Sequence, residues 1–187
     1  MSIAMEGFWD FSVRTYRTLG VSDACLSLQN DYGVDVNMLL FCCWVGAAVG
    51  PFDGELFKRA REYSARWAEN VVIPLREART WMKLTGCDSD VVPTASCMEL
   101  REEIKTVEFA AEKMQQEALE SMVSVDRTRD ERPKQIVEDV AANLMLYLEG
   151  LDIQAAIEER KKLSVIVCAA FPDFDKKTIA KAIETAS

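Results

Sequence analysis

The chain has 187 residues, of which 49% are hydrophobic and 28% are charged, so it is long and apolar enough to bury a core. Lysine and arginine number 22 against 31 aspartates and glutamates, and the net charge of -9 argues against nucleic acid as a partner. The sequence contains no histidine, which removes the commonest general base and the commonest transition-metal ligand.

Apolar residues at helical spacing predict two short helices at the start of the chain. The first covers residues 8–19 and ends at Gly20. Ser22 or Asp23 is expected to open the second helix, which Gly33 ends.

The stretch DVNMLLFCCWVGAAVG, residues 35–50, is a membrane segment, a thiol site or a buried core helix. Its uncharged run from Met38 to Val49 is well short of the ~20 residues that cross a bilayer. Asp35 or Asn37 can cap the start of a helix, and the Gly-Pro pair that follows can end it. We therefore expect a helix that is buried on all sides, and no membrane as a partner.

Longer amphipathic helices are predicted between residues 53 and 123. Asp53 opens the first, and Pro74 is expected to kink or restart the chain before a helix that runs to residue 85. Residues 95–123 form the longest predicted helix, which contains neither glycine nor proline. Its apolar stripe is expected to be a seam for another helix and consists of Leu100, Ile104, Val107, Ala111, Met114 and Ala118.

The remainder of the chain predicts a charged linker and a helical extension. The linker covers residues 126–134, and the extension, residues 135–187, contains three helices, of which Asp152 and Asp175 open the last two. The predicted fold class is all-α: an irregular multi-helix bundle with one long central helix. Residues 1–125 form its main domain, and the extension is expected to pack on it.

The six cysteines show neither a CxxC pair nor the paired spacing of a zinc site. The N-terminal residues lack the basic and apolar layout of a secretory signal. These two observations favour reduced thiols and a cytoplasmic location, without a metal or another cofactor.

Several separated motifs resemble a family of uncharacterised bacterial proteins that is catalogued as a domain of unknown function. The motifs are FWDFSVRTY, CLSLQ, GVDVNMLLFCCW and RWAENVVIPLREAR. The resemblance covers about residues 8–120 and implies a helical fold, and it brings no activity, cofactor or ligand with it. The residues after about 125 lie largely outside it.

Aromatic and polar side chains near the N-terminus are the first candidate binding residues. Asp10 and Arg14 lie four positions apart and predict an ion pair beside an aromatic stripe that includes Trp9 and Tyr16. The stripe either packs in the core or, together with Arg14, forms a recognition surface, because aromatic residues and arginine dominate binding hot spots. Asn37 either caps a helix or orients a ligand.

A basic ridge is the second candidate. Arg76, Arg79 and Lys83 lie along one edge of a predicted helix, whereas residues 99–120 are rich in glutamate. The two helices either attract each other within the fold or leave the arginines free to bind a carboxylate or phosphate.

No catalytic motif accompanies these residues, so a role without catalysis is favoured and an enzyme stays the less favoured alternative. The leading hypothesis is a cytoplasmic interaction or regulatory module that binds another protein or its own copy through helices. The alternative is a pocket in the N-terminal bundle, either of a protein that binds a small anionic ligand or of an unusual enzyme. That pocket would be lined by Trp9, Tyr16, Trp44 and Trp67, with Arg14, Arg76 or Arg79 orienting the anionic group.

Overall fold

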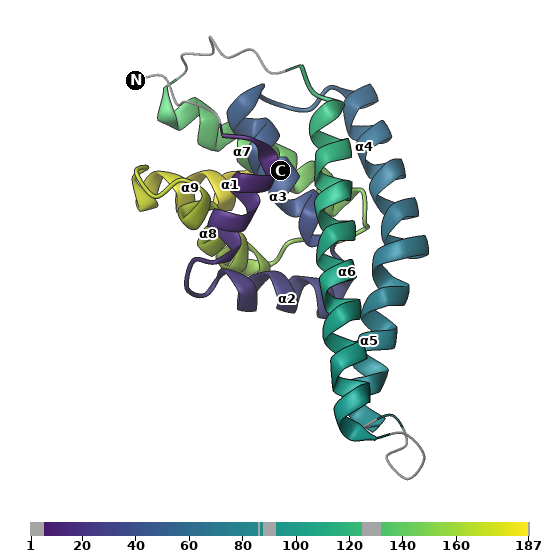
Figure 1. Cartoon of the computed structure of the whole chain (residues 1–187). Helices are drawn as coiled ribbons and strands as arrows, with labels where there is room; N and C mark the ends of the chain where they lie inside the picture. The colour runs from purple at the N-terminus through teal and green to yellow at the C-terminus, as the bar shows by residue number, and fades with distance from the viewer. Residues whose placement is uncertain (1–5, 86, 88–92, 125–131, 187) are drawn as a thin grey trace.

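The computed structural model describes residues 6–85, 87, 93–124 and 132–186. These residues form α-helices and one π-helical turn, with no β-strand among them, so the predicted all-α bundle with one long helix is confirmed (Figure 1). In chain order the elements are α1 (Phe8–Tyr16), α2 (Val21–Tyr32), α3 (Val36–Ala48), α4 (Gly54–Trp67), the π turn (Ala68–Val72), α5 (Ile73–Thr85), α6 (Thr94–Ser121), α7 (Pro133–Glu149), α8 (Ile157–Ala170) and α9 (Lys176–Thr185).

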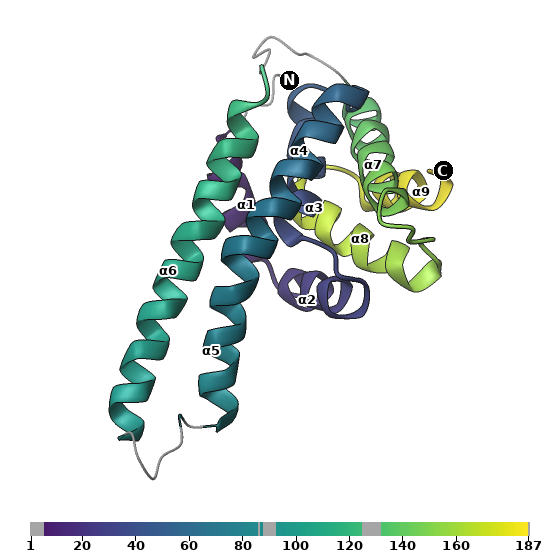
Figure 2. The ribbon, with the colours of Figure 1, turned by 90° about the vertical axis from the view of Figure 1, so that its right-hand side faces the viewer.

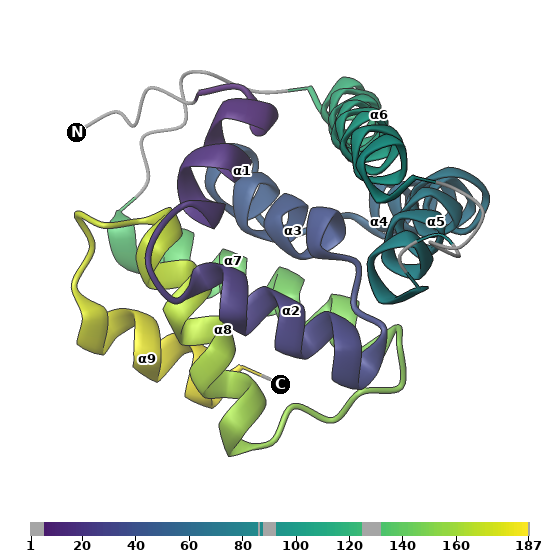
Figure 3. The ribbon, with the colours of Figure 1, turned by 60° about the horizontal axis from the view of Figure 1, so that its bottom comes forward.

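Helix α3 is the centre of the core, as its uniformly apolar sequence predicted. Every residue from Asn37 to Ala48 is buried, and α1, α2, α4, α6 and α7 all pack against the helix (Figure 3). Asp35 caps it, because a side-chain oxygen of Asp35 accepts a hydrogen bond from the backbone N–H of Asn37. None of the helices in the described ranges is long and apolar enough to cross a membrane.

The C-terminal helices complete this core. Helix α7 packs along α3, α8 crosses α1 and α2, and α9 covers α7 and α8 (Figure 3). Asn143 of α7 holds the turn between α3 and α4. Its side-chain oxygen accepts from Phe52 N–H at 2.8 Å, and its amide donates to the Gly50 carbonyl at 3.0 Å. Most of the predicted linker at 126–134 lies outside the described residues, and its last two residues belong to α7.

Helices α5 and α6 form an antiparallel hairpin whose far end projects beyond the bundle (Figures 1 and 2). We call α5 and the part of α6 beside it the arm. Helix α4 runs into α5 through the π turn immediately before Pro74, where the prediction placed a kink or a restart. Proline removes a backbone donor and crowds the preceding turn, and a wider π turn accommodates both effects. None of the residues of α5 is buried.

The predicted seam of α6 is only partly correct. Ala111 is buried and Ile104 is partly buried, but the inward face between and beyond them carries Glu108 and Gln115, which are 6% and 1% exposed. Ala118 is also partly buried. The other three apolar residues of the predicted seam face solvent, with exposures of 48%, 54% and 56%; these residues, which we call the exposed stripe, are Leu100, Val107 and Met114.

Two predicted helix caps are wrong. Helix α2 begins directly after Gly20, whose φ of 86° reverses the chain, and neither Ser22 nor Asp23 lies at the cap. Asp152 has a φ of 58° and lies in the turn after α7, while α8 begins only at Ile157. In both places the turn is made by left-handed backbone, which a search for capping side chains does not detect.

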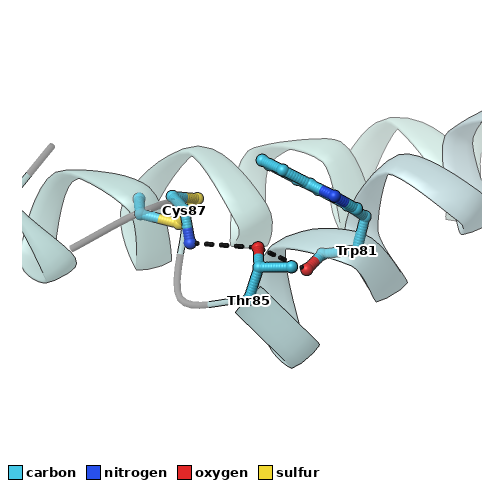
Figure 4. Close-up of a disulfide and its surroundings, with 4 residues drawn as sticks. Trp81, Thr85 and Cys87 are labelled. Carbon is cyan, nitrogen blue, oxygen red and sulfur yellow. Dashed lines mark hydrogen bonds between the residues drawn. A yellow bond between two sulfur atoms is a disulfide. The ribbon is translucent and has the colours of Figure 1, made fainter. Parts of the chain in front are cut away.

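The prediction that all cysteines are reduced is also wrong. Cys87, just after α5, forms a disulfide with Cys97 in the first turn of α6, with Cα atoms 6.0 Å apart (Figure 4). The antiparallel arrangement of α5 and α6 brings together two residues that have no paired motif in the sequence. Cys25, Cys42 and Cys43 are buried free thiols, and Cys168 is a partly exposed one.

Candidate functional site

A cavity of about 640 Å³ lies where the base of the arm meets the bundle. Helices α1, α2, α3, α5 and α6 and the π turn all contribute side chains to it. The residues that line it extend along the chain from Trp9 in α1 to Gln116 in α6. A volume of this size accommodates a small organic molecule.

A network of amide side chains forms the buried floor of the cavity. Ser12 Oγ donates to Gln116 Oε1 at 2.5 Å, and Gln116 Nε2 donates to Asn37 Oδ1 at 2.6 Å. Asn37 Nδ2 donates in turn to Gln115 Oε1 at 2.7 Å. Each amide therefore has its donor and its acceptor engaged, so the floor has one preferred arrangement.

Asp35 ends this network and ties it to two further helices. Its Oδ2 accepts from Gln115 Nε2 at 2.8 Å and from Ser64 Oγ of α4 at 2.5 Å. Its backbone N–H donates to the hydroxyl of Tyr147 in α7 at 2.9 Å. The loop before α3 is thus fixed from both sides of the molecule.

The wall of the cavity on the arm consists of charged residues that form ion pairs with one another. Arg76 Nε donates to Glu108 Oε1 at 3.0 Å, and Arg79 Nε donates to Glu108 Oε2 at 2.5 Å. Arg76 Nη2 also donates to Glu112 Oε1 at 2.9 Å. The predicted attraction between the basic ridge and the acidic helix therefore takes place within the fold, and it fixes both guanidinium groups beside the cavity.

The two carboxylates of this wall differ in their electrostatic environment. Burial acts to raise the pKa of Glu108, but the hydrogen bonds from Arg79 and Arg76 outweigh it and hold the pKa below its usual value. Burial raises the pKa of Glu112, because a single guanidinium contact does not compensate for it. Burial is also the main cause of the raised pKa of Tyr16, and the charge of Glu112 adds to it.

Part of the remaining lining is apolar and partly open to solvent. Leu26 of α2, Ile73 of α5 and Phe109 of α6 line the cavity, yet 42%, 43% and 53% of their surfaces are exposed. The ring of Phe109 meets that of Trp9 edge to face, with centroids 5.0 Å apart. Large apolar side chains exposed on three different helices thus converge on one cavity.

The structure gathers five of the candidate site residues around the cavity; they are Trp9, Tyr16, Asn37, Arg76 and Arg79. The other four lie elsewhere. Asp10 is exposed on α1, and Arg14 pairs with Glu6 at 2.5 Å in place of the predicted pair with Asp10. Trp44 is 1% exposed in the core, and its indole N–H donates to the Glu6 carbonyl. The indole N–H of Trp67 donates to the Ala111 carbonyl.

Several lining residues were not among the candidates. Gln115 and Gln116 form the floor, and Glu108, Phe109 and Glu112 form the wall. The signal for the two glutamines was present in the sequence: they are adjacent uncharged polar residues within an otherwise charged and apolar amphipathic helix. Within the described part of the chain, no group of acidic or cysteine side chains is arranged to hold a metal ion.

The family model described as "Protein of unknown function (DUF2390)" matches residues 7–119. The chain belongs to this family. All of the residues that line the cavity lie within the DUF2390 segment, whereas α7, α8 and α9 lie outside it. No curated protein matches the chain, and no solved structure does.

Proposed function

We propose that this chain is a small-molecule-binding protein whose ligand occupies the cavity at the base of the arm. The observation that carries the proposal is a cavity of about 640 Å³ that lies wholly within the family segment and has charged, amide and aromatic side chains around it. Such a combination of an apolar lining and a few fixed polar groups is typical of ligand sites.

The fixed floor supports binding in preference to catalysis. The Ser12 hydroxyl donates a hydrogen bond to the amide oxygen of Gln116, which is too weak a base to activate the hydroxyl as a nucleophile. The side chains of Asn37, Gln115 and Gln116 are held by one another before any ligand arrives. A prearranged site loses less conformational entropy when it binds.

A thermal-shift screen against a metabolite library tests this proposal. A ligand at 100 times its Kd adds about 2.7 kcal/mol to the stability of the folded state, which corresponds to a rise in Tm of about 5–10 °C for a chain of this size. Thr80→Trp places a large ring in the cavity and is expected to abolish the shift. Glu77→Trp is the matched control, because Glu77 is exposed on the same helix and does not line the cavity.

Two results would count against the proposal. One is a library in which no compound raises the Tm of the wild-type chain. The other is a shift that persists in Thr80→Trp, because the ligand would then bind elsewhere.

Self-association through the arm is a second candidate function, and it continues the interaction hypothesis from the sequence. The exposed stripe supports it: Leu100, Val107 and Met114 repeat every seven residues on a helix whose partner, α5, buries none of its own residues. Val107→Glu is expected to convert a dimer to a monomer in light scattering. A wild-type chain that is monomeric at high concentration would refute this candidate.

We also propose a cytoplasmic location in bacteria and no nucleic-acid partner. Four of the six cysteines are free thiols, which supports a reducing compartment, in which the Cys87–Cys97 disulfide would be an exception. The net charge of -9 repels a phosphate backbone. Fractionation of cells that express the chain with a tag would test the location.

A further inference from the structure

Building on the proposed function, we propose that the cavity binds a small zwitterion attached to an apolar body, the chemical class of an amino acid with an apolar or aromatic side chain. Three features of the cavity support this ligand class: unused hydrogen-bonding atoms of two arginines and of Glu112, a balance of charge, and apolar residues at the edge.

The arginines retain donors for an anionic group. Arg76 and Arg79 use Nε and Nη2 for their carboxylate partners, and Nη1 of neither donates to a group in the described ranges. Both side chains line the cavity, and they are 31% and 24% exposed. Two adjacent guanidinium edges suit a carboxylate, which accepts two parallel hydrogen bonds.

Glu112 retains an acceptor for a cationic group. Its Oε1 accepts from Arg76, while its Oε2 accepts no hydrogen bond from any residue that the structure describes. Burial disfavours the charge of this carboxylate, so a cation beside Oε2 would stabilise the ionised form. Arg76 touches Glu112 directly, so the anionic and cationic subsites lie side by side, as the two groups of an amino acid do.

The charge balance disfavours a ligand with a single charge. Three arginines and three acidic residues line the cavity; they are Arg17, Arg76, Arg79, Asp35, Glu108 and Glu112. A simple anion would compete with Glu108 for its arginines, and a simple cation would approach two guanidinium groups. A zwitterion adds no net charge and pairs with both signs at once.

The apolar part of the ligand can contact apolar side chains at the edge of the cavity. Leu26, Ile73 and Phe109 expose apolar surface at the cavity without burying it against another part of the described chain. A side chain of the ligand that covers these residues removes that surface from water.

Four related compounds separate the contributions of the positive and the negative charge to binding. Phenylalanine carries both charges, phenylalaninamide only the positive one, N-acetylphenylalanine only the negative one, and N-acetylphenylalaninamide neither. We expect calorimetry to show that phenylalanine binds at least about tenfold more tightly than each of the other three, since each of them lacks at least one charge-assisted hydrogen bond.

A variant of Glu112 tests whether this residue binds the cationic group of the ligand. Glu112→Gln keeps the acceptor for Arg76 and removes the charge, so it is expected to reduce the preference for phenylalanine over N-acetylphenylalanine about tenfold. Glu117→Gln is the matched control, because Glu117 is on the same helix, is 58% exposed and does not line the cavity. An unchanged preference in Glu112→Gln would overturn the assignment of this residue.

The outcomes distinguish this inference from the proposed function. If N-acetylphenylalanine or phenylalaninamide binds as tightly as phenylalanine, the zwitterion is wrong although the cavity still binds a ligand. If none of the four compounds binds but other library compounds give a shift that Thr80→Trp abolishes, the ligand class is wrong and the proposed function stands. If no library compound binds, both are wrong.

Discussion

The substitution Gly46→Ala tests the packing of the C-terminal extension on the family segment. A Cβ atom on Gly46 would lie 2.7 Å from both Cα and Cγ2 of Val140 and 2.8 Å from its backbone nitrogen. Carbon atoms in contact are normally about 3.5–4.0 Å apart, so α3 and α7 would have to separate by about 1 Å. Backbone atoms cannot rotate out of the way, which places the cost near the upper end of the usual ~1–3 kcal/mol for an overpacked core.

Alanine also gains about 1 kcal/mol of helix propensity over glycine, which leaves a net loss of about 2 kcal/mol. For a chain of this size we expect a fall in Tm of about 4–8 °C. Gly54→Ala is the control, because a Cβ at Gly54 meets no atom within 4 Å and the substitution should leave stability unchanged or raise it. Urea unfolding followed by circular dichroism measures both variants. If Gly46→Ala is as stable as Gly54→Ala, α3 and α7 do not cross as described.

Three further predictions concern the arm and the core. Glu108→Gln should lower the free energy of unfolding by about 1–3 kcal/mol at pH 7. Because the pKa of Glu108 is held below its ordinary value of 4.5, this loss should be complete above pH 4.5 and shrink as the pH falls through the folded-state pKa, and urea unfolding at several pH values would measure it. Asn143→Ala should cost about 1–3 kcal/mol in the same assay, since it leaves buried backbone groups between α3 and α4 without partners, and a smaller loss would contradict those hydrogen bonds. Cys97→Ser should accelerate amide exchange in α5 and leave α3 unchanged, and equal protection of α5 with and without the disulfide would show that the bond does not hold the arm together.

The order of the helices could be predicted because it depends on local information. Three aspartates that the sequence marks as helix starts are caps in the structure: Asp35, Asp53 and Asp175 each accept a hydrogen bond from a backbone N–H in the first turn. The uniformly apolar sequence of α3 likewise required burial on all sides.

The orientation of α6 could not be predicted from apolar spacing. Its inward face carries Glu108, Gln115 and Gln116, because it faces arginines and a buried amide network. Apolar periodicity locates the most hydrophobic side of a helix, and here that side includes Val107 and Met114, which are exposed. Because polar residues are buried on the inward face of α6, the apolar stripe predicted the wrong side of the helix as the packed one.

Only some residues of the candidate site could be predicted, because residue type suggests binding but does not show which polar atoms are already hydrogen-bonded. Arg76 and Arg79 could be selected because a basic ridge opposite an acidic helix is visible in the sequence. The locations of Trp44 and Trp67 depend on contacts with backbone carbonyls 38 and 44 residues away, Glu6 and Ala111. Residue type suggested binding for these indoles, but only the three-dimensional arrangement shows that their polar atoms are already satisfied.

The cavity lies between side chains of the arm and side chains of the bundle. Arg76 and Arg79 belong to the arm, whereas Trp9 and Asn37 belong to the bundle, so a swing of the arm would open or close the space between them. If a partner held the arm in one position, it would change the affinity for a molecule in the cavity, and thermodynamic reciprocity requires that molecule to change the affinity for the partner by the same factor. Movement of the hairpin would then couple ligand binding in the cavity to binding of the partner.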